Sequence, residues 1–265
     1  MAVLAQGSAP LVARPFLLGS AVMLVASLVD PVHGLAPLLG LLLLGWASYL
    51  GLLCRDGPRR IASDSNGLFS PMDGHLSLVQ REHAVARRPS ADEVGHAVDD
   101  ATSGPWVELG SAGAHLDDEL RWEARDDGEV WRMRIDVGLL DVQVHRSPSA
   151  CSVRKAELRL PAKPRSPSHP QRLRWVLDVD GGVVEVTAHL RRPRLATVPY
   201  SFEGADLRRG QRLAFLARTT WVDVRAPASQ WTPDFDLLTA WNSTKREEVV
   251  AGLTALFRRA DTGEE

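Results

Sequence analysis

The sequence has few of the residues that build disulfide frameworks and metal sites. Its 265 residues include only two cysteines, Cys54 and Cys151, too few for either a disulfide framework or a zinc site. No His-x-x-x-His, Cys-x-x-Cys, P-loop or Gly-x-Gly-x-x-Gly pattern occurs. Metal hydrolases and nucleotide-binding enzymes therefore have no support in the sequence, and we expect no bound metal ion.

An excess of charge of one sign is also missing. The chain carries 31 basic and 33 acidic residues, a net charge of −2, so it lacks the basic excess typical of nucleic-acid-binding proteins. Its length allows one domain of good size with an anchor, or two small domains. We expect no nucleic-acid partner.

Charged residues are almost absent from residues 11–53, in contrast to the rest of the chain. Leu35–Leu53 is a run of 19 residues without a charge, long enough to cross a hydrocarbon core as a helix. Phe16–Val29 is a shorter run of 14 residues, and turn residues at 30–34 separate the two. We therefore expect residues 1–60 to form a transmembrane anchor of two apolar helices.

Other interpretations of this apolar region fit less well. A cleaved signal peptide does not fit, because the second run is too long and no small-residue cleavage site precedes it. A buried hairpin would be unusually apolar, although the first arm could be re-entrant or lie in the membrane interface. Arg14 precedes the pair and Arg55, Arg59 and Arg60 follow it, which favours both ends on the cytoplasmic side. We expect the protein on the cytoplasmic face of an inner or plasma membrane.

The remainder of the chain shows the alternation typical of β-strands. Apolar and polar residues alternate from Val130 to Val137, the period of a half-buried strand. Strand-like runs follow at residues 173–179, 183–189, 196–202, 212–216 and 220–225. This spacing predicts a mainly β domain, a sandwich or barrel, over residues 61–229. Residues 81–128 lack apolar periodicity, so we expect a loosely structured polar insert with one strand near Trp106.

Residues 230–265 have a different pattern. Thr244-Lys-Arg-Glu247 matches a helix capping box, and apolar residues then recur at helical spacing up to Phe257. We expect a C-terminal extension with an amphipathic helix over 244–259. This helix would pack on the sheet or, alternatively, contact a membrane surface or a partner.

Five short motifs follow the apolar pair in a fixed order. They are Cys54-Arg-Asp-Gly-Pro-Arg59, Ser70-Pro-Met-Asp-Gly74, Asp141-Val-Gln-Val-His-Arg-Ser-Pro148, Gly210-Gln-Arg212 and Val222-Asp-Val224. Together they resemble the phosphatidylserine decarboxylase family. The resemblance implies a membrane-anchored lyase of phospholipid synthesis that converts phosphatidylserine to phosphatidylethanolamine. Its cofactor would be a pyruvoyl group, an electron sink that the chain makes by cutting itself at a Gly-Ser pair.

The resemblance also assigns site residues. Asp73 matches the family's aspartate, and Thr219 and Thr220 occupy the cleavage pair, with Thr220 in place of the serine. The family's histidine falls on Gln143, which cannot take a proton at neutral pH. His145, two residues further on, lies on the same face of a strand and either replaces that histidine or is only a polar neighbour.

These departures favour impaired or lost self-processing. Threonine is stiffer than glycine and disfavours the strained turn at Thr219. Cleavage would leave a ketobutyryl group at Thr220, and no other cofactor is expected. Arg146 is the candidate substrate-binding residue. The expected partners are membrane phospholipid and either a second copy of the chain or a partner decarboxylase, and a cluster at Arg191, Arg192 and Arg194 could face anionic headgroups or be a solvated turn.

Two non-catalytic alternatives remain open. The first is a decarboxylase homologue that binds a lipid headgroup or regulates a partner without reacting. The second is a membrane-tethered adaptor with a barrel-sandwich module similar to biotinyl or lipoyl domains, although it lacks the lysine that such carriers modify.

Overall fold

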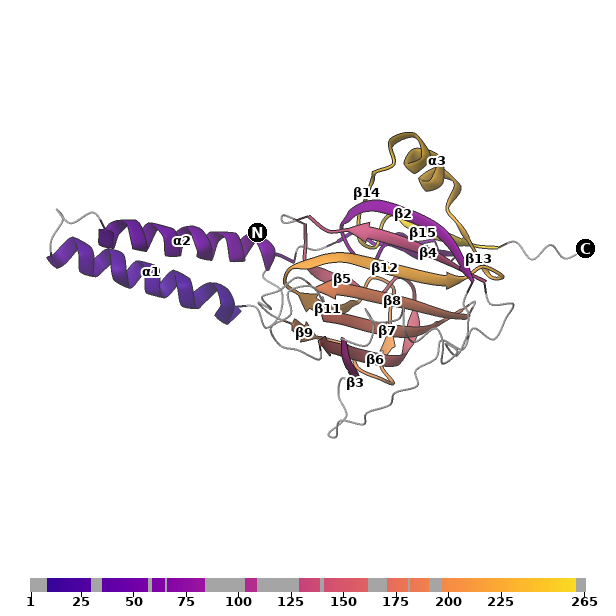
Figure 1. The fold of residues 1–265 in the computed structure, drawn as a ribbon, viewed down its shortest axis with the longest axis horizontal. Coiled ribbons are helices and arrows are strands. Elements are labelled where there is room, and N and C mark those ends of the chain that lie inside the picture. Colours follow the sequence, from indigo (N-terminus) through magenta and orange to yellow (C-terminus); the bar gives the residue numbers. More distant parts are fainter. Residues whose placement is uncertain are drawn as a thin grey trace, which may run out of the picture.

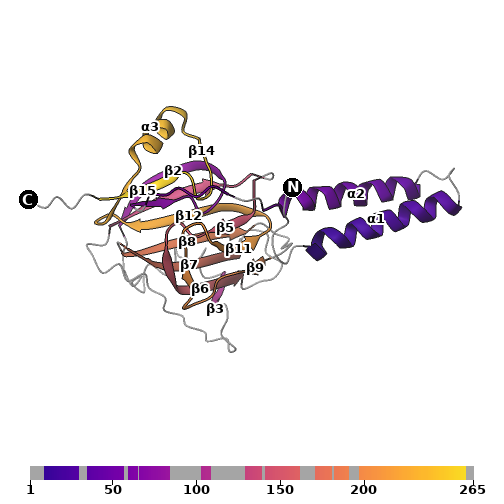
Figure 2. The ribbon, with the colours of Figure 1, turned by 180° about the vertical axis from the view of Figure 1, so that it is seen from behind.

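The computed structural model describes residues 9–29, 35–56, 59–64, 66–83, 103–108, 129–138, 141–161, 171–180, 182–190 and 197–260. These residues form a helical hairpin and a mainly β domain, and the hairpin projects from one end of that domain (Figures 1 and 2). Most of the expected polar insert and the arginines at 191, 192 and 194 lie outside the described residues.

The hairpin consists of α1 (Ala9–Val29) and α2 (Leu35–Leu53). The second helix has the predicted bounds, whereas the first begins earlier than predicted and contains Arg14 and Pro15. The two helices approach closely at glycines: a Cβ added to Gly40 would lie 2.5 Å from the Met23 Cγ. Within the described residues, no helix is both long enough and apolar enough to cross a membrane. The predicted hairpin is therefore present, but its crossing of a membrane has no support.

The β domain is built on a nine-stranded antiparallel sheet with the order β10-β6-β7-β8-β12-β4-β2-β14, and β3 also pairs with β6. Its strands are β2 (Gly74–His83), β3 (Ser103–Glu108), β4 (Glu129–Asp136), β6 (Cys151–Pro161), β7 (Gln171–Val179), β8 (Gly182–Leu190), β10 (Asp206–Leu207), β12 (Thr219–Pro227) and β14 (Glu247–Val249). The prediction of a mainly β protein is confirmed.

Two small antiparallel sheets accompany the large one. The first has the order β1 (Gly67–Phe69), β15 (Ala255–Arg259) and β13 (Trp231–Pro233). The second has the order β5 (Val144–Arg146), β11 (Arg212–Leu216) and β9 (Thr197–Pro199). This second sheet lies at the end of the domain that faces the hairpin (Figure 1).

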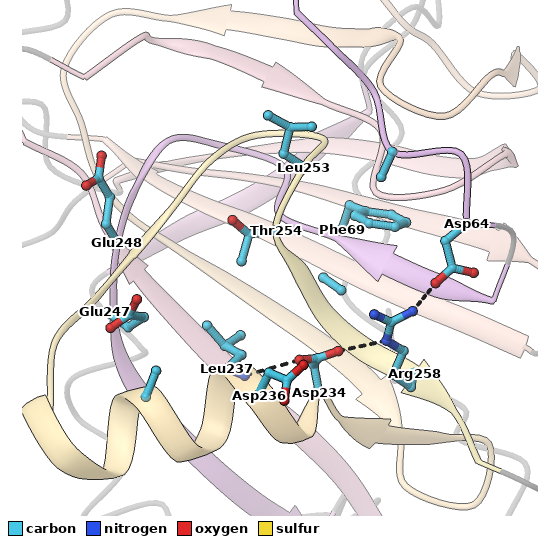
Figure 3. A pocket seen from close by; sticks show the side chains of 13 residues that line it. Asp64, Phe69, Asp234, Asp236, Leu237, Glu247, Glu248, Leu253, Thr254 and Arg258 are labelled. Carbon is cyan, nitrogen blue, oxygen red and sulfur yellow. Dashed lines mark hydrogen bonds and ion pairs between the residues drawn. The ribbon is translucent and has the colours of Figure 1, made fainter.

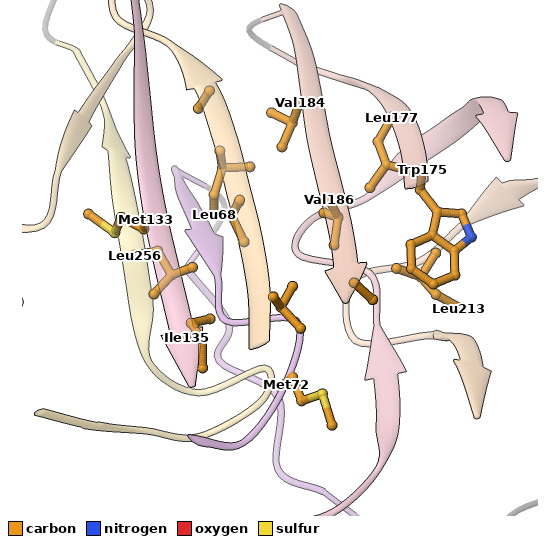
Figure 4. Packing of buried hydrophobic residues seen from close by; sticks show 14 of the residues in the cluster. Leu68, Met72, Met133, Ile135, Trp175, Leu177, Val184, Val186, Leu213 and Leu256 are labelled. Carbon is orange, nitrogen blue, oxygen red and sulfur yellow. The ribbon is translucent and has the colours of Figure 1, made fainter. Parts of the chain in front are cut away.

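The core fills the space between the large sheet and the small ones (Figure 4). Trp175 on β7 and Leu213 on β11 are fully buried in it. The core also contains Leu68, Met133, Ile135, Leu177, Val184, Val186 and Leu256. Of these side chains, those from β4, β7 and β8 come from alternate residues of each strand, as the period of two predicts.

The opposite face of the large sheet is a ladder of charged and polar side chains. Glu157, Arg174, Thr187, Asp223 and Arg134 are directly paired across five neighbouring strands. Arg174 Nε donates to Glu157 Oε2 at 2.9 Å, and Arg134 Nε donates to Asp223 Oδ1 at 2.9 Å. The ladder therefore contains two ion pairs, Glu157–Arg174 and Asp223–Arg134, on either side of Thr187, and these cross-strand pairs stabilise the pairing of the strands.

Asp223 binds three side chains, those of Arg132, Arg134 and His189. Burial by itself would raise its pKa, but hydrogen bonds from His189, Arg134 and Arg132 hold the pKa of Asp223 well below its ordinary value. The His189 ring stacks on Trp221, with the ring centroids 4.5 Å apart. The Val222-Asp-Val224 motif therefore contributes a structural carboxylate to the face opposite the core.

The predicted C-terminal helix over 244–259 is wrong. A helix, α3 (Phe235–Thr244), ends where that helix was expected to begin, and β14 and β15 follow it. Asp234 caps the start of α3, and Lys245 ends it in a left-handed conformation, so the Thr-x-x-Glu pattern does not cap a helix. The helical periodicity of this segment is overridden by tertiary pairing. β14 pairs with the edge of β2, and β15 pairs with both β1 and β13. Residues 231–259 thus belong to the β domain and are not an extension.

This correction is testable with two substitutions four residues apart. A helix would place Leu253 and Phe257 on one face, whereas the strand buries Phe257 completely and leaves Leu253 44% exposed. We expect Phe257→Ala to lower the free energy of unfolding by about 3–5 kcal/mol through loss of core packing. Leu253→Ala should change it by less than about 1 kcal/mol. Urea denaturation followed by circular dichroism measures both, and equal losses would contradict the strand assignment.

Candidate functional site

Four of the five motifs meet at one end of the β domain. Asp56, just after the hairpin, is 1% exposed and binds two arginines from other motifs. Its Oδ1 accepts from Arg146 Nη2 at 2.6 Å, and its Oδ2 lies 2.5 Å from Arg212 Nε. The backbone N–H of Arg146 donates to the carbonyl oxygen of Pro71 at 2.8 Å. Segments far apart in the sequence are therefore joined by buried polar contacts.

Arg146 makes only internal contacts in this arrangement. It is 7% exposed, and besides Asp56 its guanidinium binds the carbonyl oxygen of Gly210 at 3.0 Å. A buried ion pair of this kind is costly to break, because removing one partner leaves the other charge unpaired. The structure places Arg146 as a link between the hairpin exit and the β domain.

His145 lies in the core beside the predicted cleavage pair. It belongs to β5, is fully buried, and its Nε2 lies 3.1 Å from the hydroxyl oxygen of Thr219. Its ring also contacts the Trp175 ring at a centroid distance of 5.8 Å. Of the predicted catalytic and cleavage-site residues, the described side-chain hydrogen bonds join only His145 and Thr219.

Gln143, in the position of the family's histidine, binds the same threonine. Its Oε1 accepts from the backbone N–H of Thr219 at 2.9 Å, and its backbone carbonyl accepts from the N–H of Leu216 at 3.0 Å. The Thr219 hydroxyl donates in turn to the carbonyl oxygen of Leu216 at 3.0 Å. Gln143 therefore closes the hairpin between β11 and β12 from both strands.

Thr220 lies outside this cluster. The pairing register of β12 with β8 shifts between Thr219 and Trp221, a β-bulge that turns Thr219 toward the core. Thr220 is half-buried, and among the described residues its hydroxyl has no hydrogen-bond partner. The strained residue of this hairpin is Arg218, with a φ of 69°, not Thr219. In the structure, the hydroxyl next to His145 therefore belongs to Thr219 and not to Thr220.

Asp73 holds other parts of the domain. It forms an ion pair with Arg59, and its Oδ1 accepts from the backbone N–H of Ala251 at 2.9 Å. Among the described residues it makes no hydrogen bond to His145 or Thr219. The predicted Asp73–His145–Thr220 set is therefore not assembled as a unit.

The protonation state of His145 limits what this cluster can do chemically. Burial lowers the pKa of His145 to about 3, so the imidazole is neutral at physiological pH. A neutral imidazole can accept a proton, but the depressed pKa makes it a weak base, and Gln143 cannot serve as one. The cluster contains a hydroxyl, a weak base and an amide, and Thr219 is only 5% exposed.

A separate groove lies between α3 and β15 (Figure 3). Its volume is about 490 Å³, and none of the predicted site residues line it. Five carboxylates surround a single cation, Arg258, which binds Asp234 at 2.7 Å and also pairs with Asp64. The excess negative charge makes this groove unsuitable for an anionic lipid headgroup.

The Asp56 linkage predicts unequal costs for two carboxylate substitutions. Asp56→Asn would leave Arg146 buried without a counter-charge, and we expect it to lower the free energy of unfolding by about 3 kcal/mol. Asp73→Asn removes a partly exposed pair and keeps an oxygen for Ala251, so we expect a loss of about 1 kcal/mol. Denaturation of the two variants side by side measures the difference, and equal losses would contradict the linkage role of Asp56.

The depressed pKa of His145 predicts a dependence of stability on pH. Below its unfolded-state pKa of about 6.5, His145 binds a proton in the unfolded chain. In the folded chain His145 stays neutral until the pH falls to about 3. This contribution is therefore fully present above pH 6.5 and falls by about 1.4 kcal/mol per pH unit as the pH drops through this window. His145→Gln should remove that slope while other titrating groups, His189 among them, keep theirs. Parallel pH profiles for wild type and variant would show that His145 is not buried in its neutral form.

Comparison of the chain with protein-family models, with curated proteins and with solved structures gave no significant match. The resemblance to decarboxylases rests on the sequence motifs. What the chain does is therefore argued from its own contacts.

Proposed function

We propose that this protein is a membrane-attached relative of phosphatidylserine decarboxylases that does not cut itself and contacts phospholipid without decarboxylating it. The observation that carries the proposal is the closed Gln143–Thr219 contact, in which a glutamine occupies the position of the family's histidine. The meeting of four motifs around Asp56 supports the relationship, because unrelated turn motifs would have no reason to lie together. A barrel-sandwich adaptor would not account for these contacts.

The hairpin supports attachment to a membrane. Its helices expose many large apolar side chains, with Leu17 65% and Leu42 63% exposed. Contiguous apolar surface of this kind is rare on soluble monomers and is typical of surfaces that enter a lipid phase or an interface. At its base, Leu11 and Val12 pack on the domain against a cluster that includes Phe215. The hairpin would enter the membrane from one side, with the β domain at the surface.

The contacts of Thr219 support the loss of self-processing. Self-cleavage requires the hydroxyl oxygen to attack the preceding carbonyl carbon while a base takes the hydroxyl proton. In the folded chain this proton is donated to the carbonyl oxygen of Leu216, and the imidazole in contact with the hydroxyl, His145, has its pKa lowered to about 3. These contacts stabilise the uncut chain.

One observation favours a second candidate, an active decarboxylase that cleaves before Thr219. The 3.1 Å contact between His145 and the Thr219 hydroxyl is the geometry of a base and a nucleophile. The new chain end would then carry a ketobutyryl group from Thr219. Such an enzyme would need His145 to accept the proton despite its depressed pKa.

The intact mass of the purified chain separates the two candidates. We expect a single species of 29.0 kDa, no turnover of phosphatidylserine, and the same result for Thr219→Ala and Thr220→Ala. Two chains that split before Thr219, with cleavage abolished by Thr219→Ala but not by Thr220→Ala, would contradict the proposal and establish the second candidate.

A further inference from the structure

Two non-glycine residues in the described chain have a left-handed backbone, and both carry a positive charge: Arg218 and Lys245, with φ of 69° and 55°. This conformation is unfavourable for a residue with a Cβ. Lys245 has an evident role, because it ends α3 and its ammonium lies 4.5 Å from the centroid of the Trp241 ring. The guanidinium of Arg218 forms no hydrogen bond or ion pair with any described residue, although glycine would fit this turn without strain.

The turn that carries Arg218 lies at the end of the β domain that bears the hairpin (Figures 1 and 2). The preceding residue, Ala217, is buried in the cluster on which Leu11 and Val12 of α1 pack. Arg14, one helical turn beyond Leu11, is exposed and likewise has no partner among the described residues. Two unpaired arginines therefore lie where the apolar hairpin meets the domain.

We infer that Arg218, together with Arg14, binds the phosphate groups of anionic phospholipids at the membrane surface. This inference rests on the proposed attachment of the hairpin to a membrane. If the exposed leucines enter the hydrocarbon, the base of the hairpin lies at the level of the headgroups. A guanidinium binds phosphate through two parallel hydrogen bonds, and such a contact would account for an arginine at a turn position where glycine would fit without strain.

Vesicle flotation of the full chain tests this inference. The probes are vesicles of phosphatidylcholine alone and vesicles that also contain phosphatidylglycerol. We expect the wild-type chain to bind both and to bind the anionic vesicles more tightly. Arg218→Gly should bind phosphatidylcholine as the wild type does but lose about fivefold in affinity for the anionic vesicles, the usual effect of one arginine near such a surface. Its melting temperature should not fall, since glycine suits the turn.

Lys245→Gly is the matched control. It removes the same charge from the same backbone conformation, but at the C-terminal end of α3, away from the hairpin (Figure 1). It should leave binding to both kinds of vesicle unchanged. Arg218→Lys keeps the charge and should retain most of the preference for anionic vesicles. This variant keeps the test informative if the glycine variant does not fold.

The outcomes separate the inference from the function on which it rests. Equal anionic binding by wild type and Arg218→Gly, or equal losses in Arg218→Gly and Lys245→Gly, would overturn the role of Arg218 while leaving the attachment intact. Failure of every variant to bind phosphatidylcholine vesicles would overturn the membrane attachment itself, and the inference with it.

Discussion

Gln143 closes the hairpin between β11 and β12, and the arrangement of the candidate site depends on that contact. It accepts from the N–H of Thr219 through its side chain and from the N–H of Leu216 through its backbone. In this hairpin Thr219 faces His145, and Arg218 has a left-handed backbone conformation. The next residues along the chain from Gln143 include Arg146, whose pair with Asp56 joins this corner of the domain to the hairpin. The acceptor that binds the Thr219 N–H is the amide oxygen of Gln143, a group that does not titrate.

Much of the β domain could be predicted from the sequence because its strands alternate. This pattern predicts the strands that contain Val130, Leu173, Val183, Arg212 and Thr220, and β11 has the predicted bounds. The strand β6 escaped prediction because a bulge between Val153 and Lys155 interrupts its alternation. The C-terminal strands escaped it because Val249 and Phe257 also fit a helical period, and only the unpaired edges of distant strands decide between the two.

In the site, too, alternation alone does not predict which threonine faces the core. Alternation back from Val224 and Val222 would place Thr220 on the core side, and the motif comparison selects it as well. The β-bulge breaks that parity and turns Thr219 inward instead. The motif resemblance singled out Gln143, but nothing in the sequence indicated that its side chain would accept from the N–H of Thr219. That contact joins residues 76 positions apart and follows from the packing of β5 on β11.

The central claim is that the Gln143–Thr219 contact is part of the closed core and not an open reaction site. Amide hydrogen exchange at Thr219 tests this claim most directly, because its N–H donates to the Gln143 side chain. We predict that this amide exchanges as slowly as those of Val222 and Val224 in the same strand, through opening of the whole domain. Fast exchange at Thr219 while Val222 and Val224 stay protected would show a hairpin that opens on its own, and would contradict the account.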